Sequence, residues 1–356
     1  MNRLNQETKS EIRNVSNYRR PPAITHSESR KVNIAEINKT FDDMMPNTRN
    51  SEYNESMKLI ARKKIIEKFK SYGLDVFEQH FTVNLNGTIM NGVNVIAVRA
   101  GKKRGKCGDR LLVIGAHYDT VKGTFGVEDN GSGVVGMFEI ARILRFRKKS
   151  LKYTIMFVAF DLEEDGLIGS QLFVVNYLIP SEINRNVKFI GAFILEMVLV
   201  YNDSPNSQYL SPDIVRSSPR VVERINKTGN RGNFVAIWKR DFLDNDLWKL
   251  FNEAWDNVET PSKYNLYPFS APFPLNASVD LIREYPTFIR SDHAPFWHLG
   301  NGKLLPALLI TDMGFFREPS SNGYHNWGDN KTQLTSSNLQ FLKHTVEVLV
   351  QVLNLI

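Results

Sequence analysis

Residues 111–119 read LLVIGAHYD, and residues 153–165 read YTIMFVAFDLEED. Each stretch begins with an uninterrupted apolar run and ends in acidic residues, a pattern typical of a short β-strand that is buried on both faces. Between the two stretches, apolar residues recur at helical spacing over residues 134–146, which predicts a helix. The sequence therefore alternates strand, helix and strand, the order that is typical of an α/β sheet.

Other elements follow the same alternation along the chain. Further strands are expected at residues 76–77, 81–83, 93–98, 187–197 and 304–311, with Asn86-Gly87 as a turn. Helices are expected over residues 52–72 and 337–353, where apolar side chains fall on one face. The sequence predicts a single large α/β domain with a mixed, mostly parallel central sheet covered by helices on both faces.

Two parts of the chain depart from this pattern. Residues 1–50 are polar and charged, so we expect an N-terminal extension that has no core of its own and need not be ordered. The domain would then span residues 51–356. Within it, residues 198–290 are irregular and rich in aromatic residues, which favours an insertion with its own apolar cluster or a cap that walls a substrate pocket.

Composition excludes several classes of protein. Cys107 is the only cysteine, so an intrachain disulfide and a thiolate metal cluster are both excluded. The net charge of +7 is spread along the chain without a basic stripe interleaved with aromatic residues, so nucleic acid is not an expected partner. No apolar stretch is long enough to predict a membrane span.

The cellular compartment stays open at this level. Residues 1–30 are polar and show no apolar segment of a signal peptide. Asn-x-Ser/Thr sequons are nevertheless more numerous than the composition would give, which slightly favours an extracellular or secretory location. The sequon at Asn130 lies inside a predicted functional loop, and we expect it to remain without a glycan.

Acidic and imidazole side chains gather where the predicted strands end. His117 follows the first quoted strand, Glu163 and Glu164 follow the second, and Glu196 ends the strand at residues 187–197. The carboxyl ends of strands in an open α/β sheet border the functional crevice, so these side chains should meet there. Two adjacent glutamates after a buried strand are costly unless a cation compensates them, which favours a metal pair.

Five segments carry a resemblance to a known family. The segments are GAHYDT at 115–120, EDNGSG at 128–133, EEDGLIGS at 163–170, RSDHAPFW at 290–297, and Tyr324-His325 followed by Asp329. In this order they resemble peptidase family M28, a group of zinc peptidases with co-catalytic metal pairs. The resemblance covers roughly residues 52–356 and implies two Zn²⁺ ions per chain.

The resemblance also implies a role for each residue of the site. The implied zinc ligands are His117, Asp129, Glu164, Glu196 and His325, with Asp129 shared by both ions. Glu163 would be the general base, and Tyr324 would stabilise the oxyanion of the tetrahedral intermediate. Behind the ligands, Asp119 would orient His117, Asp329 would orient His325, and Asp292 would lie near the site.

Four features differ from the usual family pattern or call for comment. Glu196 stands where Asp is usual, which puts the occupancy of the His117 zinc site in question, and Glu128 stands where Asp or Asn is usual. The resemblance also implies a cis peptide bond between Asp129 and Asn130. Ser132 is expected to be the N-cap of the helix that follows, rather than a nucleophile.

These observations favour a zinc-dependent exopeptidase, most simply an aminopeptidase that acts on peptides through a metal-activated water. Two alternatives stay open. One is a glutaminyl-peptide cyclase-like enzyme, which shares the fold and uses one zinc ion. The other is a catalytically inactive binding ectodomain of the same fold. The sequence does not name the preferred substrate residue, and it does not separate amino- from carboxypeptidase firmly.

Overall fold

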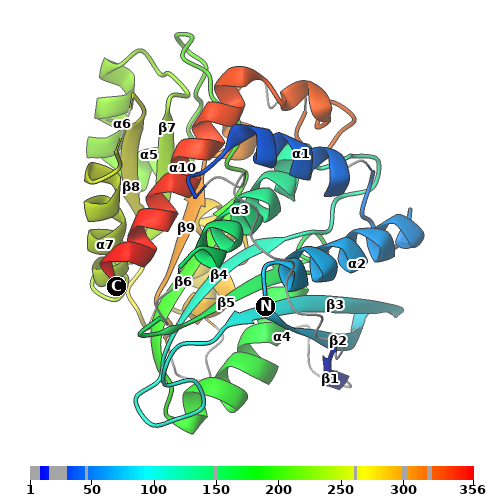
Figure 1. Cartoon of the computed structure of the whole chain (residues 1–356). Helices are drawn as coiled ribbons and strands as arrows, with labels where there is room; N and C mark the ends of the chain where they lie inside the picture. The colour runs from blue at the N-terminus through cyan, green and yellow to red at the C-terminus, as the bar shows by residue number, and fades with distance from the viewer. Residues whose placement is uncertain are drawn as a thin grey trace.

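A central sheet dominates the fold (Figure 1). The computed structural model describes residues 9–15, 30–44, 47–85, 87–147, 151–259, 263–298, 304–318 and 323–356, and these form nine strands in one sheet. Across the sheet the strands are β1 (Lys9–Asn14), β2 (Asp75–Leu85), β3 (Thr88–Arg99), β5 (Thr154–Phe160), β4 (Arg110–His117), β6 (Lys188–Glu196), β9 (Ala307–Thr311), β7 (Phe234–Lys239) and β8 (Asn265–Ser270). The predicted single α/β domain with a mixed sheet is confirmed.

The parallel part of the sheet lies at its centre. β4 runs parallel to β5 and β6, and β6 runs parallel to β9. Near the edges, β7 pairs in parallel with β8, while the pairs β1–β2, β2–β3, β3–β5 and β7–β9 are antiparallel. Parallel pairs are therefore half of the pairings among the described strands, fewer than the sequence indicated.

Alternation along the central strands divides the core into two layers. In β4, Leu112 and Ile114 belong to one apolar cluster, while Leu111 and Val113 belong to the other. Because successive side chains of a strand point to opposite faces, a continuous apolar run fills both layers. This explains why the quoted strands read as unbroken apolar runs.

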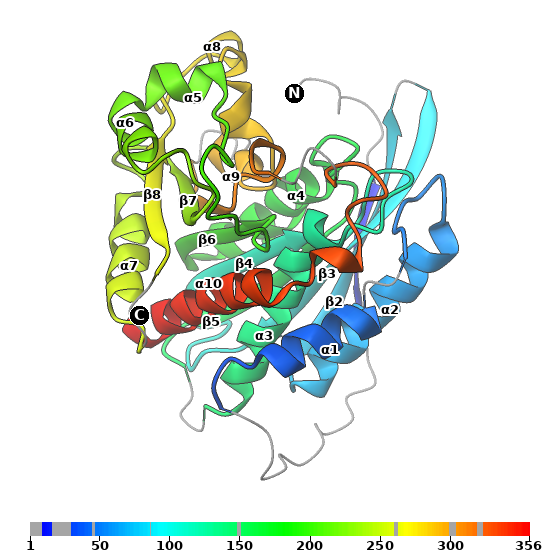
Figure 2. The same cartoon turned by 90° about the horizontal axis from the view of Figure 1, so that it is seen from above.

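Helices cover both faces of the sheet, as predicted (Figure 2). One face carries α1 (Ile34–Met44), α2 (Glu55–Ser71), α3 (Gly133–Arg145), α7 (Asn245–Asp256) and α10 (Ser336–Leu355). The other carries α4 (Ile168–Phe173), α5 (Pro212–Ser217), α6 (Pro219–Lys227), α8 (Val279–Arg283) and α9 (Ala294–His298). Shorter helical segments are η1 (Val127–Ser132), η2 (Val174–Glu182), η3 (Ile183–Arg185), η4 (Pro286–Ile289), η5 (Gly314–Phe316) and η7 (Lys331–Gln333).

The N-terminal part of the chain differs from the expected polar extension. β1 pairs with β2, and α1 packs against α3 and α10. Ile37 and Phe41 of α1 are fully buried in the main apolar cluster. The sequence indicated that residues 1–50 have no core of their own, and the structure shows that Ile34–Met44 packs into the core of the main domain. Apolar residues recur there at helical spacing, but the polar neighbours hide the pattern in the overall composition.

The irregular stretch at residues 198–290 contributes to the same sheet. Within it, β7 pairs with β9 and β8 extends the sheet beyond β7. Trp238 of β7 and Phe269 of β8 are buried in the apolar layer that also contains Trp297. This region therefore completes the sheet edge in addition to any role as a cap.

The first hairpin is longer than the sequence indicated. β2 runs without interruption through both of the short strands expected there, and it pairs along its whole length with β3. Gly87 lies in the turn with a φ of 93°, a conformation that glycine adopts readily, whereas its turn partner Asn86 lies outside the described residues. Among the described helices, none combines the length and the apolar character that a bilayer crossing requires.

Candidate metal centre

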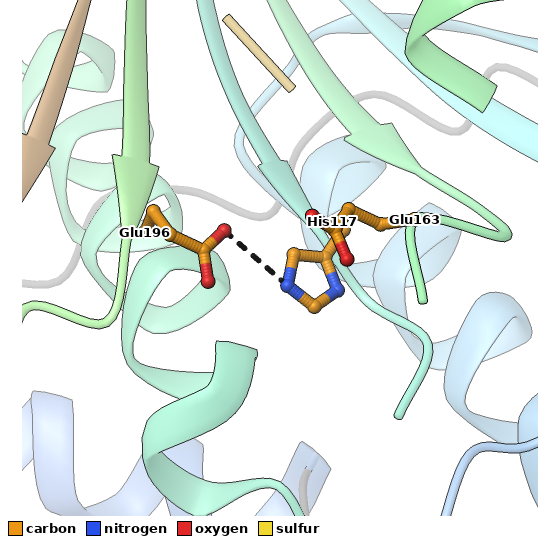
Figure 3. A group of neighbouring side chains, drawn as sticks. All are labelled: His117, Glu163 and Glu196. Atoms are coloured by element: carbon orange, nitrogen blue, oxygen red, sulfur yellow. Dashed lines mark ion pairs between the residues drawn. The ribbon is translucent and has the colours of Figure 1, made fainter. Parts of the chain in front are cut away.

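Three strand ends bring polar side chains together at one edge of the sheet. His117 is the last residue of β4, Glu196 is the last residue of β6, and Glu163 lies three residues beyond the end of β5. Figure 3 shows the side chains of His117 and Glu196 facing each other, with Glu163 beside the imidazole. One possible ligand atom from each of the three residues lies within 4.8 Å of the others. The predicted convergence at the carboxyl ends of the strands is observed.

Asp129 lies between two histidines that are far apart in the sequence. Its Oδ1 atom is 3.3 Å from Nε2 of His117, and its Oδ2 atom is 3.2 Å from Nε2 of His325. Each histidine also faces a glutamate: His117 Nε2 is 3.4 Å from Oε2 of Glu196, and His325 Nε2 is 3.4 Å from Oε2 of Glu164. The structure thus forms two histidine–glutamate sets that share one aspartate.

The donor set fits divalent metal ions such as zinc. Imidazole nitrogens and carboxylate oxygens are common zinc donors, with bonds of about 2.0–2.1 Å, and donors of one tetrahedral ion are then about 3.3–3.4 Å apart. The four separations between facing donors here are 3.2–3.4 Å. In addition, Nε2 of His117 and Oε1 of Glu164 are buried and have no hydrogen-bond partner among the described residues. Such atoms are costly unless another group binds them.

The charges of the site perturb one another strongly. Burial lowers the pKa of His117, but the carboxylates of Glu196 and Glu163 outweigh it and raise this pKa well above its usual value. Burial and the nearby Asp129 raise the pKa of Glu164 to about 8. Burial would lower the pKa of His325, yet hydrogen bonds to Asp129 and Glu164 raise it to about 10. Negative charge is therefore in excess, and a bound cation would relieve it.

Asp119 supports two of the segments that carry donors. Its Oδ1 atom is 3.4 Å from Nδ1 of His117, which makes no hydrogen bond to the described residues, so the orienting role stays a prediction. Its two carboxylate oxygens also accept hydrogen bonds of 3.2 Å from the backbone N–H groups of Glu163 and Glu164. One aspartate therefore lies beside the imidazole and holds the double-glutamate turn.

Asp329 makes different contacts from those predicted. Its Oδ1 atom accepts the backbone N–H of Glu128 at 2.7 Å, and its Oδ2 atom accepts that of Asp129 at 3.0 Å. These hydrogen bonds hold the loop of the shared aspartate, whereas the described contacts include none between Asp329 and His325. The prediction that it orients His325 is corrected accordingly: Asp329 braces η1.

Two residues that the sequence analysis had not assigned hold the side chain of Glu196. Ser291 Oγ donates to its Oε2 atom at 2.7 Å, and Nδ2 of Asn130 lies 3.3 Å from the same oxygen. Hydrogen bonds from these two residues thus fix the carboxylate of Glu196, whose side chain is longer than that of the usual aspartate. Ser291 lies inside the motif at residues 290–297, and its neighbour Asp292 is fully buried. Burial raises the pKa of Asp292 to about 7, although the nearby His117 opposes this.

The loop of the shared aspartate has an unusual backbone. The Asp129–Asn130 peptide bond is cis, as the family resemblance implied, and Asn130 is fully buried. Ser132 is not a helix cap, because its backbone is already helical and its side chain bonds no N–H of α3. Its hydroxyl instead donates to the carbonyl of Glu128 at 2.7 Å and accepts the N–H of Val198 at 3.0 Å. The hydroxyl therefore ties the loop to the end of β6.

A cleft of about 300 Å³ opens beside the metal donors. Its polar side carries Asp129, Glu163, Glu164, Glu196, Tyr324 and His325. Its other side is largely apolar and carries Met197, Trp238, Leu309, Met313 and Phe316. The ring of Tyr324 stacks on His325 at a centroid distance of 3.8 Å, and its hydroxyl oxygen accepts a hydrogen bond of 3.2 Å from Arg290.

Comparisons with known proteins relate part of this chain to a peptidase family. Residues 94–233 match the model described as "Peptidase family M28". An uncharacterized Escherichia coli protein, YfbL, is 28% identical over 68% of this chain and 66% of its own length. Aminopeptidase YwaD of Bacillus subtilis is 39% identical over 32% of this chain and 25% of its own length. The chain thus aligns with less than two thirds of the length of these curated relatives.

A solved structure shares the fold. The aminopeptidase from Aneurinibacillus sp. strain AM-1 superposes with a TM-score of 0.59 over 89% of this chain and 93% of that one, at 16% identity. At this level of identity the similarity establishes the architecture, and the chemistry of the site has to be argued from the residues themselves.

Proposed function

Because the chain belongs to peptidase family M28, we propose that it is a zinc-dependent exopeptidase, an aminopeptidase that removes N-terminal residues from peptides. The observation that carries this proposal is the position of Asp129, whose two carboxylate oxygens face His117 and His325. A carboxylate shared in this way is what a closely spaced metal pair requires. Peptides are the proposed substrates.

We assign one zinc ion to His117 and Glu196 and a second to Glu164 and His325, with Asp129 shared between them. When bound, the metal pair would supply a water of lowered pKa and a Lewis acid for the scissile carbonyl. Hydrogen bonds of Asp119, Asp329, Ser291 and Asn130 support the side chains and backbone segments that carry the donors. These supports favour a site that is organised for tight binding.

Glu163 is the proposed general base. A carboxylate oxygen of Glu163 lies within 4.8 Å of donor atoms of His117 and Glu196. Glu163 is nevertheless outside the two histidine–glutamate sets described above. Burial, together with Glu196, Glu164 and Asp292, raises its pKa well above the usual value, although His117 opposes this. A carboxylate of raised pKa accepts a proton from water and passes it to the leaving amine more readily than an exposed one does.

Tyr324 is the proposed donor to the oxyanion. Since Arg290 donates to the hydroxyl oxygen of Tyr324, the hydroxyl hydrogen is free to point into the cleft. Burial, with Asp129 nearby, raises the pKa of Tyr324 far above its usual value, so the hydroxyl keeps its proton at any working pH.

Tyr324→Phe is expected to lower kcat by about 10- to 100-fold, the effect of losing one hydrogen bond to a developing charge. KM and bound zinc should change little, because the ring still stacks on His325. Steady-state kinetics with an aminoacyl-anilide would measure kcat and KM separately. Tyr209→Phe, at an exposed tyrosine, serves as the control. An unchanged kcat in Tyr324→Phe would remove the residue from the mechanism.

The overall function is tested by metal content and turnover of the purified chain. We expect elemental analysis to find zinc and the chain to hydrolyse aminoacyl-anilides. Chelation should lower the activity by about 100-fold or more, and added zinc should restore it. Zinc loading without any turnover would instead support a binding protein. Conversion of a peptide with N-terminal glutamine into its cyclic product would support the cyclase, and cleavage only from the carboxyl end would exclude an aminopeptidase.

A further inference from the structure

An arginine upstream of α2 joins the two ends of a loop at the candidate metal centre. The side chain of Arg49 is fully buried, with only 1% of its surface exposed. Its Nε atom donates to the carbonyl of Tyr118 at 2.6 Å, Nη1 donates to that of Phe125 at 2.7 Å, and Nη2 donates to that of Gly126 at 2.8 Å. One planar guanidinium therefore bonds to both ends of the loop at residues 118–126, which connects β4 to η1.

Backbone hydrogen bonds strengthen the same connection. The N–H of Arg49 donates to Oγ1 of Thr120 at 3.0 Å, and the N–H of Thr120 donates to the carbonyl of Arg49 at 3.3 Å. Asn50 adds a hydrogen bond of 2.9 Å from its Nδ2 atom to the carbonyl of Thr120. Gly126 allows the close approach, because a Cβ atom there would lie 2.8 Å from Nη2 of Arg49.

These contacts bear directly on the metal donors. Tyr118 follows His117 in the chain, and Gly126 precedes Asp129 by three residues. One rigid fork holds the carbonyl groups at both ends of this loop, and the residues just outside the two ends carry His117 and Asp129, whose Nε2 and Oδ1 atoms are 3.3 Å apart. Burial lowers the pKa of Arg49 to about 10, with Asp329 and Asp119 opposing, so the guanidinium stays charged near neutral pH.

We propose that Arg49 is a positioning residue of the metal centre, which sets the spacing of His117 and Asp129 without contacting a metal ion. The inference rests on the metal site proposed above and extends it beyond the stretch at residues 94–233 that matches the family model. The segment around Arg49, which the sequence placed in the polar N-terminal extension, is then part of the metal-binding unit.

The test compares two buried arginines that bond to carbonyl groups in the same way. Arg240 is 2% exposed, donates to the carbonyls of Trp297 and Leu305, and pairs with Asp244. Arg49→Lys and Arg240→Lys each replace a guanidinium group, which donates several hydrogen bonds, by a single ammonium group. Both variants should therefore lower the Tm of the metal-free protein. Only Arg49→Lys should raise the zinc dissociation constant, by about 10- to 100-fold, measured by competition with a chromogenic chelator.

A milder variant guards against loss of the fold. Thr120→Val removes the Oγ1 acceptor of the Arg49 N–H and leaves the guanidinium in place, so it should weaken zinc binding in the same direction by a few-fold. Zinc affinities of Arg49→Lys and Thr120→Val equal to that of the unaltered chain would overturn the inference. An equal loss in Arg240→Lys would also overturn it, since the effect would then be general destabilisation. Failure of the unaltered chain to bind zinc would instead sink the proposed function.

Discussion

Glu163→Gln is expected to lower kcat by about 10²- to 10⁴-fold while zinc remains bound at the level of the unaltered chain. Glutamine has nearly the shape of glutamate, but its amide does not accept a proton from water at neutral pH. Glu163 is buried beside His117 and Glu196, so solvent is poorly placed to replace it as a base. Elemental analysis and steady-state kinetics on the same preparation would measure both quantities.

The matched control for this variant is another buried glutamate. Glu182 is 4% exposed and pairs with Arg104 through bonds of 2.5 and 2.6 Å, on a part of the chain that does not line the cleft. Glu182→Gln should leave kcat and zinc content unchanged, even if it lowers the Tm. If Glu163→Gln kept the original kcat, the general base would have to be sought elsewhere. If it lost zinc, Glu163 would be a ligand.

Asp129→Ala is expected to weaken the binding of both zinc ions by roughly 100-fold and to lower turnover with it. Each ligand of a four-ligand zinc site contributes about 3 kcal/mol to the binding free energy. Losing the shared carboxylate should therefore raise the dissociation constant of each zinc ion by roughly 100-fold. Because the same residue separates His117 from His325, its removal also leaves two histidines of raised pKa without their common acceptor. Zinc titration followed by calorimetry would report the loss at both sites.

Two further variants make this result specific. Asp329→Asn keeps the shared ligand but weakens the two hydrogen bonds to the backbone of η1, so it should cost zinc affinity about 10-fold, much less than Asp129→Ala does. Asp165 is exposed and follows the double glutamate, and Asp165→Asn should leave zinc binding as it was. Full binding of both ions by Asp129→Ala would refute the shared-ligand assignment.

Much of the fold could be predicted because the central strands obey a strong local rule. A strand buried on both faces must be apolar at every position, so β4 and β5 stand out from their own residues alone. The ends of these strands then place His117 and Glu163 at one edge, and the family resemblance supplied Asp129 and His325. The convergence of these residues follows from topology and is seen in the structure.

The features that the sequence did not reveal share a physical cause, since each depends on contacts between distant parts of the chain. α1 is helical in pattern, yet its burial depends on α3 and α10, which lie about a hundred and three hundred residues further on. Ser291 and Arg49 are ordinary residues until the fold brings them to Glu196 and to the carbonyl of Tyr118. No local pattern marks a hydrogen bond between residues that are 69 or 95 positions apart.

The packing of α1 against α10 has a consequence for synthesis on the ribosome. Because α1 packs against α10 as well as α3, part of the apolar face that carries Ile37 and Phe41 stays uncovered until α10 has been synthesised, some three hundred residues later. At about 5–20 residues per second, this interval lasts tens of seconds, during which an exposed apolar surface favours aggregation. Complete burial of α1 therefore depends on a contact that forms late in the synthesis of the domain.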